Sequence, residues 1–76
     1  MGVGDEIMKV FIENLKGYMS IYENIKRIKI CKKDNKGCLQ LEYIFSPIIE
    51  YIPLKDIRLC YAMDMEKFVE YFRYEK

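Results

Sequence analysis

The stretch IKRIKICKKDNKGCLQLEY, residues 25–43, decides the fold that this sequence predicts. Ile28 and Ile30 alternate with polar or small residues before the segment DNKG, and Leu39 and Leu41 alternate with such residues after it. A period of two on both sides of a turn-forming segment is typical of a β-hairpin. The two apolar sets then share one face, which we expect to pack on a core.

This shared face also fixes a register, because a slip of one residue would turn the apolar side chains towards water. We expect Ile30 to lie opposite Leu41, with the turn at residues 34–37. The same register places Lys29 opposite Glu42 on the outer face, where opposite charges stabilise a sheet by roughly a few tenths of a kcal/mol.

The first half of the hairpin is strongly basic. Six of the chain's thirteen lysines and arginines lie there: Lys26, Arg27, Lys29, Lys32, Lys33 and Lys36. With Asp34 as the one carboxylate, residues 25–37 have a net charge of +5, on a chain whose net charge is +1. Such segregation is typical of a site for an anionic partner. It is also typical of an exposed strand, where lysines prevent pairing with other chains.

Nucleic-acid sites usually add arginines for base edges or aromatic side chains for stacking. Arg27 is the one arginine among these cations, and Tyr43 points to the opposite face in the expected register. We therefore favour the interpretation that the lysines protect an exposed strand. Two alternatives stay open, namely weak binding of RNA or DNA by the basic hairpin at residues 26–36, and contact with an acidic protein surface.

The N-terminal segment has the apolar spacing of a helix. Its apolar residues fall three and four positions apart: Met8, Phe11, Ile12, Leu15, Met19 and Tyr22. This spacing is one stripe of an α-helix, and Asp5 can cap its first turn. We predict a helix from Asp5 to Tyr22, with an end at Lys16 as the alternative, because Gly17 is a common residue just past a helix.

The segment SPIIEYIPLKDIRLCYAM, residues 46–63, predicts two further strands. Residues 48–52 form the first, and Pro53 confines it to a sheet edge because proline cannot donate a backbone hydrogen bond. Residues 57–62 alternate and form the second. A helix that begins at Pro53 is the alternative.

The C-terminal segment predicts a second helix, capped by Asp64, with Met65, Phe68, Val69 and Phe72 on one stripe. Because the same residues have high β-propensity, a β-hairpin is the alternative. The predicted fold class is a single α+β domain over residues 1–76. It has an N-terminal helix, an antiparallel sheet of three to four strands and a C-terminal helix, with both helices on one face of the sheet.

The composition excludes most catalytic chemistry. The chain has no histidine, so it cannot form a Ser-His or Cys-His pair and lacks the commonest general base near neutral pH. No glycine-rich phosphate loop is present, and no apolar run approaches the roughly 20 residues that cross a bilayer. We predict a non-enzymatic protein without a catalytic residue, a cofactor, a small-molecule substrate or a membrane partner.

The three cysteines do not predict a metal site either. Structural zinc takes four Cys or His ligands at close spacing, and Cys31 and Cys38 have six residues between them. An odd number of cysteines without a secretory segment indicates a reducing cytoplasm. We expect Cys31 and Cys38 to lie diagonally on the outer face of the hairpin, and a redox-sensing pair is a third functional hypothesis.

The aromatic content points to an interface. Seven tyrosines and four phenylalanines occur on a chain of 76 residues, and a chain of this size buries only about 60% of its unfolded surface. Some apolar surface therefore stays exposed, which often marks a site of association. We expect a binding or regulatory module that acts as a homo-oligomer or with a protein partner, through an exposed strand edge or the helix face carrying Tyr71 and Tyr74.

Overall fold

The computed structural model describes residues 7–64 and 67–74, which form one antiparallel sheet of six strands. The strands are β1 (Met8–Asn14), β2 (Met19–Lys33), β3 (Lys36–Tyr43), β4 (Ile49–Pro53), β5 (Ile57–Asp64) and β6 (Lys67–Arg73). Their order in the sheet is β4-β3-β2-β1-β5-β6, so β4 and β6 are its edges. Within the described residues, the only helical element is the 3₁₀ turn η1 (Leu54–Asp56). The predicted α+β class is therefore wrong, and the fold is all-β.

The predicted N-terminal helix is replaced by β1, a tight turn and the start of β2. Asn14 organises this turn, because its Oδ1 accepts hydrogen bonds from the backbone N–H groups of Lys16 and Tyr18, each at 2.9 Å. Gly17 has a φ of 93°, which residues with a Cβ rarely adopt. The glycine that interrupted the helical pattern thus belongs to a hairpin turn.

The helical spacing arose because β1 is apolar on both faces. Val10 and Ile12 are buried on the inner face, and Phe11 contacts Tyr61 of β5 on the outer face. A strand with two apolar faces places apolar residues three and four positions apart as well as two apart, so the two periods overlap. Asp5, the predicted helix cap, lies outside the described residues.

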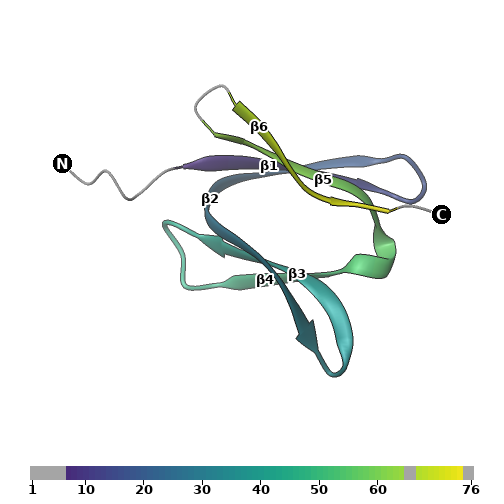
Figure 1. Cartoon of the computed structure of the whole chain (residues 1–76). Helices are drawn as coiled ribbons and strands as arrows, with labels where there is room; N and C mark the ends of the chain where they lie inside the picture. The colour runs from purple at the N-terminus through teal and green to yellow at the C-terminus, as the bar shows by residue number, and fades with distance from the viewer. Residues whose placement is uncertain (1–6, 65–66, 75–76) are drawn as a thin grey trace.

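Strand β2 bends the sheet. Its first part pairs with β1 and its second part with β3. At the junction Asn24 has a φ of 61°, and the ladder to β3 has a bulge between Ile25 and Arg27. Bulges bend a strand and increase its twist. As a result, β1, β5 and β6 lie on one side of the molecule and β3 and β4 on the other (Figure 1).

The hairpin predicted at residues 25–43 is present, but its register differs from the prediction by two residues. Asp34 and Asn35 have φ values of 57° and 65°, so the turn has two residues with left-handed backbone, as in a type I′ turn, rather than four. Ile30 therefore lies opposite Leu39 instead of Leu41. Because the shift is even, every side chain keeps its predicted face.

The new register changes the cross-strand charge pairs. Gln40 lies opposite Lys29, and Glu42 lies opposite Arg27. The Arg27 Nη1 and Glu42 Oε2 atoms are 3.9 Å apart. The expected pair of Lys29 with Glu42 is therefore wrong, and Arg27 takes its place.

The two strands predicted after the hairpin are confirmed as β4 and β5. Strand β4 lies at a sheet edge and ends at Pro53, and the alternative helix is limited to η1. The predicted C-terminal helix is wrong, and the β-hairpin alternative is correct. Strand β6 pairs with β5, with Val69 opposite Ala62. Met65, on the predicted helical stripe, lies outside the described residues.

The core lies between the two sides of the bent sheet. Its buried residues come from β1, β2, β3 and β5: Val10, Ile12, Ile25, Leu39, Leu41, Ile57, Cys60 and Ala62. The inner faces of the two sides thus meet in one apolar cluster. Consequently the two outer faces point in opposite directions, and both are available to partners.

Candidate binding surfaces

The outer face of β2, β1, β5 and β6 is mostly apolar. The register places seven apolar side chains on it, which we term the aromatic face: Phe11, Met19, Ile21, Leu59, Tyr61, Met63 and Phe68. Phe68 is 64% exposed and Ile21 is 54% exposed. Adjacent exposed apolar side chains are unusual on a monomeric protein and often mark an interface.

Three aromatic rings form the centre of this face. The rings of Phe11 and Tyr61 are stacked, with centroids 5.1 Å apart and planes at 14°. Phe68 continues the row, with its centroid 5.7 Å from that of Tyr61. These contacts hold the rings in place across three strands, so the face needs little ordering of side chains when a partner binds.

Charged residues border the aromatic face and are mostly paired. Arg58 Nη1 lies 3.3 Å from Glu13 Oε2, and Arg73 Nη2 lies 2.8 Å from Glu70 Oε1. The hydrogen bond from Arg73 lowers the pKa of Glu70. Four of the charges that border the face are therefore already compensated by ion pairs within the chain.

The predicted interface tyrosines lie beside this face. Tyr71 belongs to the edge strand β6, and Tyr74 follows it, with its backbone N–H bonded to the Arg58 carbonyl oxygen at 2.8 Å. Their exposed fractions are 37% and 48%. They lie on a strand edge rather than on a helix, and the rings of Phe11, Tyr61 and Phe68 were not predicted as a site. No alternation in the sequence marks these rings, because β1 and β6 are at least partly apolar on both faces.

The six predicted cations do not share one surface. Alternation along β2 puts Arg27, Lys29 and Lys33 on the outer face and Lys32 on the opposite face. Lys26 lies at the bulge. Lys36, opposite Lys33 at the end of β3, joins the outer group. Among the described residues, β1 pairs with β2 only up to Ile25, so the basic part of β2 has one free edge.

A groove lies where this outer group meets β4. Its volume is about 730 Å³, within the range of ligand sites. Gly37, Cys38, Pro53 and Leu54 form an apolar base. We term it the cationic groove.

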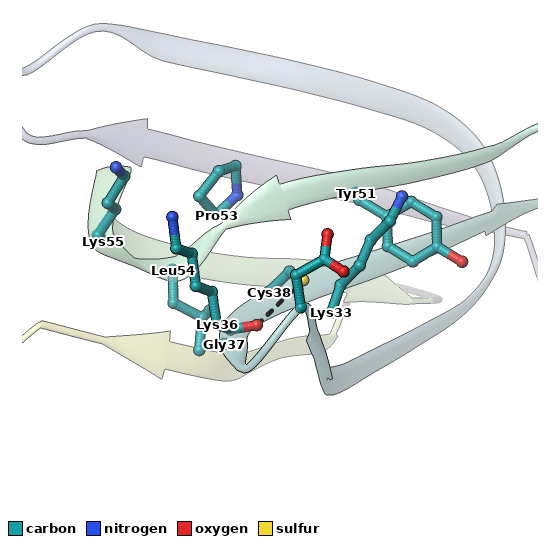
Figure 2. A pocket seen from close by; sticks show the side chains of 9 residues that line it. Lys33, Lys36, Gly37, Cys38, Tyr51, Pro53, Leu54 and Lys55 are labelled. Atoms are coloured by element: carbon teal, nitrogen blue, oxygen red, sulfur yellow. Dashed lines mark hydrogen bonds between the residues drawn. The ribbon is translucent and has the colours of Figure 1, made fainter.

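Three lysines and one tyrosine surround the cationic groove. Lys33 Nζ lies 4.1 Å from the centroid of the Tyr51 ring, a cation–π contact. Figure 2 shows this pair at one end of the groove and Lys55 beside Pro53 at the other. Lys36 and Asp34 complete the rim.

Tyr51 is the residue that the sequence interpretation missed. In the predicted register, the aromatic residue nearest to the basic hairpin is Tyr43, which points to the opposite face. Strand β4 brings Tyr51 next to the basic hairpin, since Tyr51 lies opposite Gln40, which in turn lies opposite Lys29. The sequence predicts a strand at residues 48–52, but it does not predict the strand beside which this segment lies.

The inner face carries one polar cluster with raised pKa values. The Tyr43 hydroxyl donates a hydrogen bond to Glu50 Oε1 at 3.0 Å. Burial, together with this bond, raises the pKa of Tyr43 to about 12. Burial also raises the pKa of Cys60 to about 11. Both groups are therefore neutral near pH 7, and Cys60 lacks the thiolate that a nucleophile needs.

The hairpin cysteines lie directly opposite each other, not diagonally as predicted. Both are free thiols, and Cys38 is buried while Cys31 is partly exposed. The Cys31 thiol donates to Gln40 Oε1 and the Cys38 thiol to the Lys36 carbonyl oxygen, each at 3.6 Å. Burial of Cys38 disfavours a redox sensor, because sensor thiols are accessible to oxidants.

No group of three or more His, Cys, Asp or Glu residues in the described part of the chain could hold a metal ion. Across residues 7–64 and 67–74, no helix is long and apolar enough to span a membrane. Comparisons with models of protein families, with curated proteins and with solved structures find no match for this chain.

Proposed function

We propose that the protein is a small, non-enzymatic binding module that associates with a second copy of itself through the aromatic face. The observation that supports this proposal is the row of rings formed by Phe11, Tyr61 and Phe68, which crosses three strands on an outward face. We further propose that it acts in the cytoplasm, where its three cysteines would stay reduced.

A second copy is favoured as the occupant because the face is complementary to itself. Lys9 and Glu13 flank Phe11 on the outer face of β1. A two-fold axis through Phe11 would bring Lys9 of one copy near Glu13 of the other, which is the geometry of an isologous interface. Because the face carries both a positive and a negative side chain, it is complementary to a second copy of the chain rather than to a partner with a strong charge of one sign.

The experiment compares two substitutions of the same residue type. Phe68→Lys places a charge on the aromatic face, whereas Phe45→Lys changes a phenylalanine that is 75% exposed and lies after the end of β3. We expect the unmodified chain and Phe45→Lys to form the same oligomer in light scattering, and Phe68→Lys to be monomeric with an unchanged circular dichroism spectrum. A monomer of 9.2 kDa at high micromolar concentration for the unmodified chain would contradict the proposal.

A further inference from the structure

We propose that the cationic groove binds single-stranded nucleic acid, with phosphates on Lys33, Lys36 and Lys55 and a base against Tyr51. This site uses the opposite side of the bent sheet from the aromatic face. It is therefore independent of the self-association proposed above, and either proposal can fail alone.

The charge of the groove favours an anion. Lys33 and Lys36 lie directly opposite each other, and like charges in this position destabilise a sheet. No ion pair within the described residues involves Lys33, Lys36 or Lys55. With Asp34 as the one acidic residue on the rim, the lining has a net charge of +2. A bound phosphate would relieve the repulsion between the lysines.

The apolar part of the groove favours a nucleotide over inorganic phosphate. Tyr51, Pro53 and Leu54 line it together with the lysines, and Tyr51 is 41% exposed. Base stacking on an aromatic ring tolerates every base, because each base has a π-face. Lys33 covers part of the Tyr51 ring in the unbound protein, so binding would move its ammonium group from the ring to a phosphate and open the ring to a base.

A single strand fits better than a duplex. The groove sits beside a two-residue hairpin turn, with Lys36 and Lys55 from different elements around it. It contains no arginine and no element that could enter a major groove, and such features read base edges in duplex DNA. Unstacked bases can instead reach Tyr51 directly. We therefore expect little dependence on sequence.

The test measures anisotropy of labelled oligouridylate and oligothymidylate, which separate RNA from DNA, with a labelled polyglutamate peptide as the third ligand. Each titration is carried out at about 50 mM and at about 200 mM salt, because the affinity that phosphate contacts provide falls steeply between these concentrations. We expect binding of one or both oligonucleotides, a log-log salt slope near −2 for about three phosphate contacts on a single strand, and at least about tenfold weaker binding of polyglutamate, which cannot stack on an aromatic ring.

Two variants assign the binding to the groove. Lys33→Gln/Lys36→Gln/Lys55→Gln should weaken binding at least about tenfold and flatten the salt slope. The matched control is Lys16→Gln/Lys32→Gln/Lys67→Gln, which removes the same charge from three exposed lysines outside the groove, including Lys32 on the other face of the hairpin. We expect the control to bind within about threefold of the unmodified chain, because its lysines would contact no phosphate.

Tyr51→Leu keeps an apolar side chain and should weaken binding about tenfold, because stacking is lost. Circular dichroism of each variant verifies the fold. The proposal is overturned by equal losses in the two triple variants, by an unchanged affinity of Tyr51→Leu, by equal or tighter binding of polyglutamate, or by the absence of oligonucleotide binding at the lower salt concentration.

Discussion

The two sides of the bent sheet share one core but differ in the chemistry of their outer faces. On the side of β1, β5 and β6, rings contact rings and the bordering charges are paired. On the side of β3 and β4, Lys33 lies over the Tyr51 ring, and an ion pair joins Arg27 to Glu42 at 3.9 Å. Lys36 and Lys55 line the same groove as Lys33. One face therefore suits an apolar partner and the other an anion.

This difference shows how a small sheet can carry two surfaces without two domains. The bend in β2 turns residues of one strand towards opposite sides, so Ile21 contributes to the aromatic face and Lys33 to the cationic groove. Because both faces depend on the same buried cluster, changes in the core should affect them together. Changes on either outer face should affect that face alone.

The largest effect should come from Leu41→Ala, which creates a cavity where the two sides meet. Leu41 is fully buried, and such substitutions lower the free energy of unfolding by about 2 to 5 kcal/mol. We expect a loss of about 3 kcal/mol in urea denaturation, with both self-association and ligand binding weakened. The control is Ile30→Ala on the same inner face, where the side chain is 52% exposed. Equal losses for the two variants would contradict the shared core.

The next effect concerns pH and the thiol of Cys60, which is fully buried at the centre of the core. Its pKa is raised from 9.0 to about 11 in the folded chain. Between these values the unfolded thiol ionises and the folded thiol stays protonated, so stability falls as the pH rises. This contribution is complete below pH 9 and amounts to roughly 2 to 3 kcal/mol when fully lost.

Cys60→Ala isolates this contribution from the tyrosines, which also titrate at alkaline pH. At neutral pH the variant should be less stable than the unmodified chain, because it leaves a small cavity. The difference should shrink between pH 9 and pH 11, as followed by urea denaturation at several pH values. A difference that stays constant over this range would show that the Cys60 thiol ionises equally in both states.

The two hairpin turns, one on each side of the molecule, can be compared by removing a glycine from the first and adding a glycine to the second. The first change should lower stability and the second should not. Gly17→Ala forces a Cβ into a left-handed backbone, although no atom lies within 4 Å of that position, so we expect a loss of about 1 to 2 kcal/mol from backbone strain alone. Asn35→Gly, at a φ of 65°, should be neutral or stabilise by up to about 1 kcal/mol. Thermal denaturation measures both, and a stable Gly17→Ala variant would contradict the geometry of the first turn.

The smallest effects should separate the two hairpin cysteines. Cys31→Ser changes a partly exposed thiol and should cost under about 0.5 kcal/mol. Cys38→Ser puts a hydroxyl into a buried site opposite Pro53 of β4 and should lower the free energy of unfolding by about 1 kcal/mol. Equal melting temperatures for the two variants would show that Cys38 is less enclosed than its 6% exposure indicates.

Much of the cationic side could be predicted from the sequence, and much of the aromatic side could not. Residues 25–43 alternate on both sides of a turn, so the hairpin and its faces follow from local pattern. The shift of two residues in its register comes from the left-handed backbone of Asp34 and Asn35, which shortens the turn. Turn length is the weakest part of such a prediction, because several turns suit the same residues.

The helices were predicted from apolar spacing that strands can also produce. In β1 and β6 both faces are at least partly apolar, as with Val10 and Phe11, or Phe68 and Val69. The spacing of three and four then appears without a helix. The high β-propensity of the C-terminal residues favoured the correct alternative there, and Gly17 was the corresponding local signal in the N-terminal segment.

The sequence by itself determined the hairpin at residues 25–43, the edge position of the strand before Pro53, the local excess of positive charge and the absence of a histidine-based site. Only the tertiary structure decided that residues 8–22 form a strand, a turn and the start of a second strand, that Phe11, Tyr61 and Phe68 form one row, and that Tyr51 lies beside Lys33. The physical reason is that a sheet is stabilised by contacts between residues far apart in the chain. Those contacts depend on which strands become neighbours, and local periodicity does not specify this.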